Sequence, residues 1–419
     1  AKPRIRGSRF RPPRTMTEPT LSAEQLLTRF QALDVFLLRH QALWRPKPFV
    51  QLQLPWEREL PQLAAWLRAR TLQQAEASHG RPWELDAPAP FAELATQAKA
   101  LAALGELPQT ATDARPARLA VDVPGRKLQQ IQAFASRLQF ATPAGHWLDW
   151  CAGKGHLGRW LAHEGQRLTC LEYDPALVAS GAALSHRQGL DARHLQQDVL
   201  AAGAAGHLLA EHTPVALHAC GDLHVRLLQL ASARGCRQLA VAPCCYNRIA
   251  TPHYQPLSTA AQGSSLQLSR DDLGLPLSET VTAGARVRRQ RDQSMAWRLA
   301  FDLLQRQLRG VDQYLPTPPL AADWLAKPFA RFCHDLAALR GVPTPGAQDW
   351  AELEARGWQR LAEVRNLELL RHLFRRPLEL WLLLDRALYL QEQGYAVRLG
   401  SFCDYRLSPR NLLLLAERA

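Results

Sequence analysis

The sequence predicts an α/β fold with a mostly parallel sheet closed by an antiparallel hairpin, with helical segments before it and inserted into it. Two observations predict the sheet. Short apolar runs alternate with helical stretches over 146–242, which is typical of βαβ units. The end of the chain then reads as a helix over 378–393, a strand over 395–402, a turn at 408–411 and a strand over 412–416, which indicates a terminal hairpin at one edge of the sheet.

Helices are predicted before the sheet. Ser22 and Gln25 form a capping-box pattern, and apolar residues follow them at helical spacing until Pro46 ends the helix. Two further helices are expected over 60–75 and 89–104. Nothing in the sequence of these helices indicates a function.

The elements divide the chain into five predicted segments. They are a disordered basic tail at 1–16, a helical N-terminal domain at 17–115, the first part of the sheet domain at 116–254, a helical insertion or lid at 255–375, and the final helix and hairpin at 376–419. Within the sheet domain, a helix over 126–138 precedes strands expected at 146–150, 168–172, 194–197, 215–219 and 238–242.

Composition excludes several classes of protein. The hydrophobic fraction of 47% is enough to build cores, so wholesale disorder is excluded. No run of eighteen apolar residues or signal peptide is visible, so we expect a cytoplasmic protein with no membrane partner. Eight cysteines without regular spacing indicate no disulfide framework. The net charge is +13, but six basic residues lie in the tail, so charge alone argues weakly for nucleic acid.

The strongest chemical motif is the run CAGKGHLGR, which follows the first expected strand. Asp149 ends that strand, where it can fix the loop and accept a hydrogen bond from a ligand amine. Ala152, Gly153 and Gly155 are small enough for the backbone to approach a nucleotide-like ligand closely. Taken alone, such a turn is also compatible with a purely structural role or with an NAD enzyme.

Two more acids end the next two strands. Glu172 can take both hydroxyls of a ribose, and Asp198 can accept from an adenine amino group. Each acid taken alone is better interpreted as a solvated strand end. Three acids ending three successive strands after a glycine turn favour a nucleotide-type cofactor. NAD is disfavoured because the turn is not G-x-G-x-x-G and because the final hairpin does not belong to the NAD-binding fold.

Together these features resemble a class I S-adenosylmethionine-dependent methyltransferase, which has a Rossmann-like sheet. More narrowly, CAGKGHLGR, HACGDL, APCCYN and LSPRNLLLLA resemble the methyltransferase family of the methyltransferase-like 25 type, which includes the ribosomal-RNA-adenine-dimethylase-domain-containing and glutathione-S-transferase-C-terminal-domain-containing proteins. The resemblance covers 120–250 and 376–419, and it implies fold and cofactor but no particular substrate. One departure is Cys151, where the wider superfamily usually has the first glycine of the loop.

The resemblance implies S-adenosyl-L-methionine as the cofactor. The cofactor-binding residues that it implies are Asp149, Cys151, Ala152, Gly153, Gly155, Glu172, Asp198 and His218.

A second group of residues follows the fourth and fifth strands. Ligands of open α/β sheets bind outside the carboxyl ends of the strands, so this group is expected to face the transferred methyl group. His218 or Asp222 is a candidate general base, and Tyr246 and Asn247 are candidates to stack on and hydrogen-bond a planar acceptor. The pattern is also similar, more distantly, to tRNA 2′-O-methyltransferases of the acceptor-stem type, which have Cys-Gly…Asp-Leu and Cys-Cys elements in the corresponding places.

Three cysteines in the same region raise the question of zinc. Cys220, Cys244 and Cys245 come close if the two strands are adjacent, and His218 would complete a set of four ligands. However, the spacing is not that of a zinc motif, and adjacent cysteines point in opposite directions on an extended chain. The sequence therefore predicts no metal, and thiols that pack beside the cofactor.

An arginine-rich stretch over 286–309 is the remaining signal. Arg288 and Arg289 are candidates for a phosphate-contacting face in a lid over the active site. A solvated helix face is the alternative, because arginine outnumbers lysine throughout the chain. The prediction is a methyltransferase that acts on RNA, either tRNA or rRNA. A protein or small-molecule acceptor, and a non-catalytic binding or scaffold module, remain as alternatives.

Overall fold

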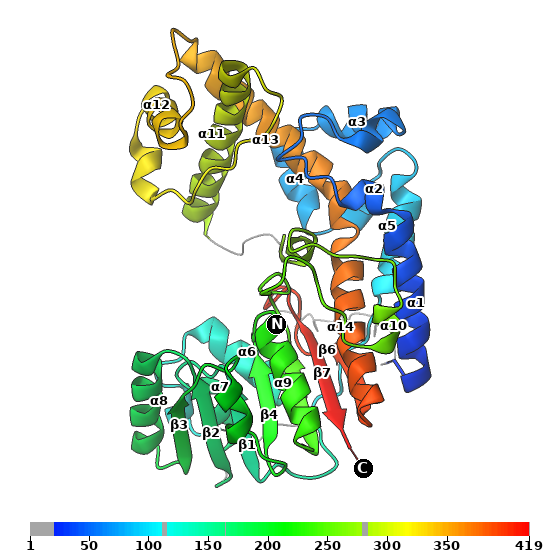
Figure 1. Cartoon of the computed structure of the whole chain (residues 1–419), viewed down its shortest axis with the longest axis vertical. Helices are drawn as coiled ribbons and strands as arrows, with labels where there is room; N and C mark the ends of the chain where they lie inside the picture. Colours follow the sequence, from blue (N-terminus) through cyan, green and yellow to red (C-terminus); the bar gives the residue numbers. More distant parts are fainter. Residues whose placement is uncertain (1–20, 111–114, 164, 279–283, 419) are drawn as a thin grey trace, which may run out of the picture.

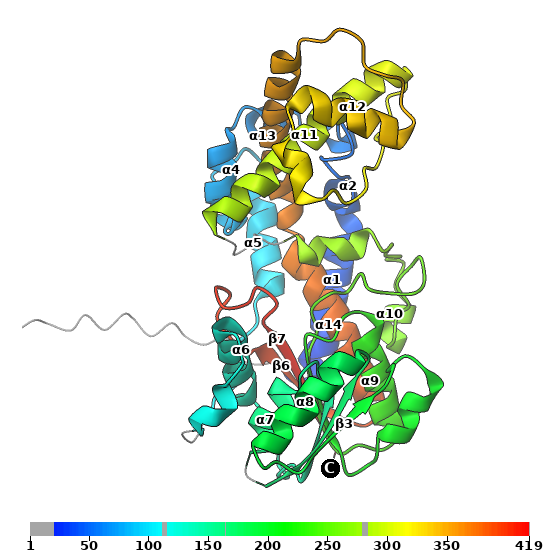
Figure 2. The ribbon, with the colours of Figure 1, turned by 90° about the vertical axis from the view of Figure 1, so that its left-hand side faces the viewer.

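The computed structural model describes residues 21–110, 115–163, 165–278 and 284–418, so the predicted basic tail lies outside the described residues. A sheet lobe lies at one end of the molecule, and a column of helices rises beside it toward a helical arm at the other end (Figure 1). The view turned by 90° shows the same arrangement (Figure 2). Among the described helices, none combines the length and the apolar character needed to span a membrane.

The sheet has seven strands in the order β3-β2-β1-β4-β5-β7-β6. The strands are β1 (His146–Trp150), β2 (Arg167–Glu172), β3 (Ala192–Gln196), β4 (Thr213–Leu217), β5 (Gln238–Ala242), β6 (Ala396–Ser401) and β7 (Leu412–Glu417). The pairs among β1 to β5 are parallel, whereas β7 is antiparallel to both β5 and β6. This is the Rossmann-like sheet of class I methyltransferases, with the terminal hairpin that was predicted.

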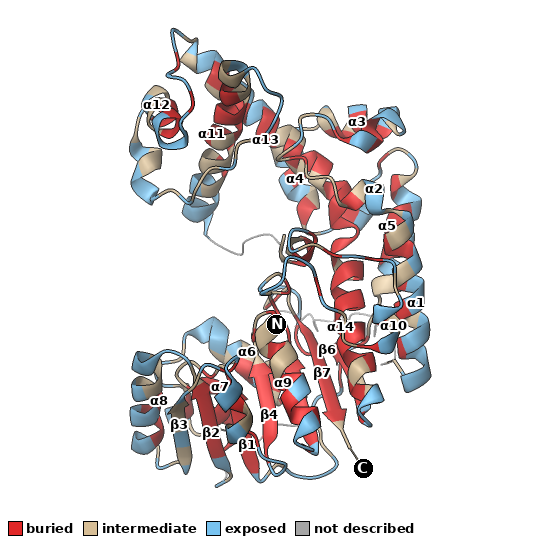
Figure 3. Cartoon of the chain, in the orientation of Figure 1, coloured by how far each residue is buried: buried red, intermediate tan, exposed pale blue. Residues whose placement is uncertain are grey.

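The strands read as apolar runs because both faces of the sheet are covered. Successive residues point to opposite faces, so each strand contributes to two cores. In β5, for example, Leu239 and Val241 belong to one buried cluster, whereas Ala240 and Ala242 belong to the other. The central strands are accordingly made largely of buried residues (Figure 3).

Five helices pack around the sheet. They are α6 (Gly125–Ala135), α7 (His156–Leu161), α8 (Pro175–Arg187), α9 (Asp222–Ala233) and α14 (Arg375–Glu392). Apolar residues of α6 and α7 belong to the cluster on one face, and those of α9 and α14 belong to the cluster on the other. The 3-10 helix η5 (Asp272–Leu277) also packs against α14.

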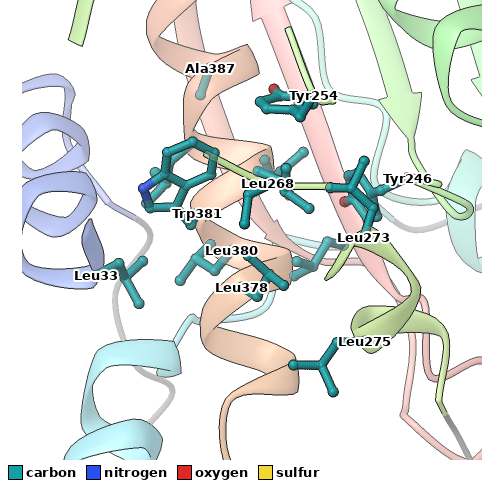
Figure 4. Close-up of a cluster of buried hydrophobic side chains, with 14 of the residues drawn as sticks. Leu33, Tyr246, Tyr254, Leu268, Leu273, Leu275, Leu378, Leu380, Trp381 and Ala387 are labelled. Carbon is teal, nitrogen blue, oxygen red and sulfur yellow. The ribbon is translucent and has the colours of Figure 1, made fainter. Parts of the chain in front are cut away.

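The N-terminal helices share a core with α14. They are α1 (Ala23–Arg39), α2 (Gln41–Trp44), α3 (Pro61–Arg68), α4 (Leu72–His79) and α5 (Phe91–Ala102). The rings of Phe30 in α1 and Trp381 in α14 lie 5.1 Å apart between centroids. Figure 4 shows side chains of α14 between Leu33 of α1 on one side and Tyr246 on the other.

Two predictions about these helices have different outcomes. The capping box at the start of α1 is confirmed, because Ser22 accepts from the main-chain N–H of Gln25 and the Gln25 side chain accepts from that of Ser22. The single helix predicted over 60–75 is wrong. Thr71 caps a new helix there by accepting from the N–H of Gln74 at 3.2 Å, so α3 and α4 are separate.

Most of the inserted segment forms the helical arm. The helices of the arm are α11 (Ala285–Arg309), α12 (Phe329–Arg340) and α13 (Trp350–His372), whereas the first helix of the insertion, α10 (Thr259–Gln262), packs against α14. Helix α13 packs along α11 and also against α3 and α4, so the arm joins the N-terminal helices. In both views the first turn of α11 is the end of that helix nearest to the sheet (Figures 1 and 2).

Candidate functional site

The candidate site lies where the strand order reverses, between β1 and β4. These strands are paired in parallel, with Asp149 opposite Val215, so the loops that follow them emerge side by side. Open α/β sheets bind their ligands at such a point. The structure therefore brings together the loop at 151–155 and the loop at 218–222, as the sequence predicted.

The side chain of Asp149 connects the two ends of the first loop. Its side chain is 3% exposed, and its Oδ2 accepts a hydrogen bond of 2.9 Å from the main-chain N–H of Gly158 in α7. Burial raises the pKa of Asp149 to about 6, although the hydrogen bond from Gly158 and the positive charge of Lys127 oppose this shift. Its position in the structure is that of a residue that ties the end of β1 to the helix after the loop.

The loop has an unusual backbone. Cys151, Gly153 and Gly155 all have a positive φ, of 59°, 58° and 70°. A residue with a Cβ is strained there by about 1–2 kcal/mol, so Cys151 has a backbone conformation that favours glycine. Burial and the charges of nearby acids raise the pKa of the Cys151 thiol to about 12.

The two glycines of the loop have different surroundings. A Cβ on Gly155 would lie 2.7 Å from Cε1 of His194 and 3.0 Å from Sγ of Cys170, so this glycine is required by the packing of α7 on the sheet. A Cβ on Gly153 would meet no atom within 4 Å. The loop therefore borders open space at Gly153.

Glu172 and Asp198 lie at the same edge of the sheet. Oε2 of Glu172 accepts from the N–H of Gly153 at 2.7 Å, and its Oε1 accepts from the N–H of Asp174 at 3.0 Å. Oδ1 of the exposed Asp198 accepts from the N–H of Leu200 at 2.9 Å. Because a carboxylate oxygen has two lone pairs, both acids keep acceptor capacity for the hydroxyl or amino groups of a ligand.

His218 follows β4 with a φ of 69°, and its Nε2 lies 3.0 Å from Oε1 of Gln130. Because Gln130 offers an acceptor, this contact assigns the proton to Nε2 and leaves Nδ1 as an acceptor. Burial, followed by the positive charges of Arg410 and Lys127, lowers the pKa of His218 to about 4. The ring is therefore neutral at neutral pH, and its surroundings disfavour the protonated form.

Asp222 ties two loops together. Its Oδ2 accepts from the N–H of Ala250 at 2.8 Å, and its own N–H donates to the carbonyl of Arg248 at 3.0 Å. The preceding residue, Gly221, has a φ of 52°, and a Cβ there would lie 1.9 Å from the same Arg248 carbonyl oxygen. The loops after β4 and β5 are thus locked against each other.

The prediction for Tyr246 is wrong. Its side chain is 1% exposed, with the guanidinium of Arg386 5.1 Å from the ring centroid and the ring of His224 at 6.0 Å. Figure 4 shows it beside Leu273, inside the core that α14 closes. The ring therefore cannot stack on an acceptor. Asn247 is half-buried, and its Oδ1 has no hydrogen-bond partner among the described residues, so it remains a candidate to bind the acceptor.

The structure also assembles a cluster that the sequence argument dismissed. The sulfur atoms of Cys220, Cys244 and Cys245 all lie within 4.8 Å of one another, and those of Cys220 and Cys244 are 3.3 Å apart. The premise about adjacent cysteines was wrong, because Cys244 and Cys245 follow the end of β5 and do not have strand conformation. Hydrogen bonding with Cys244 and the nearby arginines lower the pKa of Cys245.

The arginine-rich helix α11 divides into two parts. Its later arginines are bound within the fold, as Arg298 is to Thr317 and Pro318, and Arg306 to Asp302. Arg286, Arg288 and Arg289 are exposed in the first two turns. The predicted basic face is thus limited to the start of the helix.

A cavity of about 230 Å³ lies beside the start of α11. It is lined by Ala75, Glu76, His79, Arg288, Arg291 and Arg365. His79 is 7% exposed, and its Nε2 has no hydrogen-bond partner among the described residues. Burial and the positive charges of nearby arginines lower the pKa of His79 to about 4. The cavity therefore combines positive charge with an unused polar atom.

Comparison with known proteins assigns a domain to the sheet lobe. Residues 126–252 match the model of a family described as a methyltransferase domain. This segment begins in α6 and ends after β5, so it contains both loops of the candidate site. Over this segment the chain is thus similar to methyltransferase domains.

Several solved structures are similar at low identity. Coclaurine N-methyltransferase bound to N-methylheliamine and SAH matches over 83% of this chain and 92% of that chain, at 12% identity and a TM-score of 0.24. A protein from Listeria monocytogenes assigned to the class I S-adenosylmethionine-dependent methyltransferases matches over 58% and 76%, at 13% identity and a TM-score of 0.21.

A third similar structure concerns the conversion of a disulfide bond into a thioacetal group during echinomycin biosynthesis. The match covers 33% of this chain, at 21% identity and a TM-score of 0.21, and the chain spans about half, 54%, of that protein. Because these TM-scores are low, the assignment of the fold rests on the strand order of the sheet.

Proposed function

We propose that this chain is an S-adenosylmethionine-dependent methyltransferase that binds its cofactor against the loop after β1. The observation that carries the proposal is the position of Glu172, whose carboxylate lies beside Gly153 at the point where the strand order reverses. A ribose placed in the open space at Gly153 would meet the free lone pairs of this carboxylate. Asp198, at the end of β3, is placed to accept from the adenine.

The acceptor would lie beyond the ends of β4 and β5. When bound, the cofactor supplies a methyl sulfonium, and the protein aligns the acceptor with it and excludes water. His218 and Asp222 are the candidate bases: Nδ1 of the neutral His218 ring is an acceptor, whereas Asp222 already binds the main chain of the neighbouring loop. Asn247 is the candidate to hydrogen-bond the acceptor.

Calorimetry with S-adenosylmethionine tests the cofactor site. We expect the natural chain to bind it and Asp149→Ala with Gly153→Arg to lose binding, because the arginine fills the open space beside the loop. Gly189→Arg is the matched control, since Gly189 also has a positive φ of 67° and open space around its Cβ position. Absence of binding by the folded natural chain would contradict the proposal and favour a scaffold function.

RNA is the acceptor class that we propose. It is supported by the exposed Arg286, Arg288 and Arg289 at the end of α11 nearest to the sheet, and by the basic cavity beside them. Arginine contacts phosphate through a planar fork of donors, and a buried imidazole nitrogen offers one more polar contact. In this proposal the helical arm holds the phosphate backbone while the sheet lobe performs the transfer.

A further inference from the structure

We propose that Cys220, Cys244 and Cys245 form a binding site for a thiophilic divalent cation of the zinc class. The site would have three thiolate ligands and one open coordination position. This inference is independent of the acceptor proposed above.

The distances between the sulfur atoms suit a single ion. Zinc binds thiolate sulfur at about 2.3 Å in tetrahedral geometry, which places two ligating sulfurs about 3.8 Å apart. Here all three sulfurs lie within 4.8 Å of one another, and those of Cys220 and Cys244 are 3.3 Å apart. Small rotations of the side chains would bring the three to a common ion. Iron–sulfur clusters, with ligands spread around several metal atoms, would need wider spacing.

The scaffold around the cluster is already rigid. Cys220 follows β4 and the other two cysteines follow β5, and these strands are paired. The N–H of His218 donates to the carbonyl of Ala242 at 3.2 Å, which extends the pairing beyond the strands. Asp222 then bonds to the loop after Cys245 through Ala250. The ligands are therefore held in place by main-chain contacts that do not involve the metal.

The local charge also suits a thiolate-bound ion. Three thiolates and one divalent cation leave a net charge of −1. Arg248 and Arg410 lie close enough to Cys245 to act on it electrostatically, and they offset that excess. Cys244 is 4% exposed, whereas Cys220 and Cys245 are half-buried. An ion bound there would be shielded on one side and open on the other, which is the arrangement of zinc sites that keep a position for water or substrate.

A second cluster of metal-ligating side chains is a weaker candidate. His146, Glu211 and His212 also gather their ligand atoms within 4.8 Å. However, Glu211 is already paired with Arg167 at 3.1 Å, and Nδ1 of His212 accepts from the N–H of Leu209 at 3.1 Å. A cation there would compete with an arginine for the carboxylate, so the three cysteines are the site that we assign.

Cobalt binding to the reduced full-length chain is the direct test, because cobalt substitutes for zinc and reports on its ligands. We expect one Co²⁺ per chain, with an intense thiolate-to-cobalt charge-transfer band that Zn²⁺ abolishes. Cys220→Ser and Cys245→Ser should each weaken binding by more than about 100-fold, since even partners outside the ligand shell contribute about 10–100-fold. Cys333→Ser, in the distant helix α12, is the control and should bind as the natural chain does.

A second measurement on the natural chain does not depend on the folding of variants. Zn²⁺ should protect Cys220, Cys244 and Cys245 from alkylation, read by peptide mass spectrometry, whereas Mg²⁺, which prefers oxygen ligands, should not. A chain without the charge-transfer band, or without protection, would overturn the proposal. So would a Cys220–Cys244 disulfide that persists when the chain is purified with zinc. Both readouts are independent of cofactor binding, so failure of the methyltransferase proposal would leave them unchanged.

Discussion

The main-chain N–H of Gly153 donates a hydrogen bond of 2.7 Å to the Glu172 carboxylate, so the acid at the end of β2 holds the loop that follows β1. The same carboxylate also accepts from the N–H of Asp174. Glu172 therefore holds the loop in shape before any ligand binds. The carboxylate that contacts the ribose in the proposed complex thus also stabilises the structure of the loop.

Replacing Glu172 by alanine should weaken cofactor binding by more than tenfold, because it removes both the proposed ribose contact and the bond that shapes the loop. A hydrogen bond to a charged group contributes about 1.5–3 kcal/mol, which supports this magnitude. Titration calorimetry with S-adenosylmethionine measures the effect. Glu93→Ala, on α5, is the control and should bind normally. Equal affinity of both variants would contradict the assigned role of Glu172.

Cys151 offers a test of backbone strain in the loop. Its φ of 59° favours glycine, so Cys151→Gly should be more stable to urea than Cys151→Ala by about 1 kcal/mol. Both variants lack the thiol, so the comparison isolates the Cβ. At ordinary positions alanine is the more stable of the two, because glycine has the more flexible unfolded chain. Greater stability of the alanine variant would show that the loop relaxes out of this conformation.

Gly221 is expected to be intolerant of any side chain. Gly221→Ala should lower the free energy of unfolding by more than about 2 kcal/mol, because the new Cβ would lie 1.9 Å from a main-chain oxygen of Arg248 at a φ of 52°. Gly206→Ala is the control, since no atom lies within 4 Å of its Cβ position. Urea unfolding measures both. Similar stabilities would mean that the loops after β4 and β5 are free to separate.

His224 predicts how stability depends on pH. Its Nε2 accepts from Nε of Arg386 at 2.7 Å and its Nδ1 donates to the carbonyl of Ala219, so the folded protein holds it neutral. Burial, followed by the charge of Arg386, lowers the pKa of His224 well below its usual value. Only the unfolded chain then takes up a proton as the pH falls below about 6.5, so the contribution of His224 to stability is complete above that pH and decreases below it.

The expected slope for this one residue is up to about 1.4 kcal/mol per pH unit below about pH 6.5. Urea unfolding over a series of pH values should show a shallower loss for His224→Gln than for the natural chain. Other buried histidines, such as His372, contribute in the same direction and remain in both proteins. Identical slopes would show that His224 is protonated in the folded state.

The sequence predicted the sheet well and the side-chain environments less well, for physical reasons. A strand covered on both faces is an apolar run, so β1 and β5 were predicted with the bounds that the structure shows. The sequence placed Asp149 and Glu172 correctly because the carboxyl ends of parallel strands all lie at the same edge of the sheet. Local pattern defines such features.

The misplaced residues depend on contacts between distant parts of the chain. Tyr246 is buried because Arg386 of α14 covers its ring, and nothing near Tyr246 in sequence indicates this contact. A partial signal was present, since Asp385 and Arg386 interrupt an apolar stretch and turn out to bind Tyr254 inside the core. Charges inside an apolar helix can thus belong to a buried polar network that joins distant segments.

The last prediction is that the arginines in the first two turns of α11 contact RNA. Replacing both Arg288 and Arg289 by alanine should weaken tRNA binding and reduce the slope of log affinity against log salt by about 1–2, because each phosphate contact contributes about 0.7–0.9. Fluorescence anisotropy at several salt concentrations measures this, and calorimetry should show unchanged cofactor affinity. Arg340→Ala, at the exposed end of α12, should leave RNA binding intact. RNA affinity that does not change would exclude this helix end as the contact surface. If the natural chain binds the cofactor but no RNA, a protein or small-molecule acceptor would be favoured. The cofactor site would then be functional while the proposed phosphate contacts are absent.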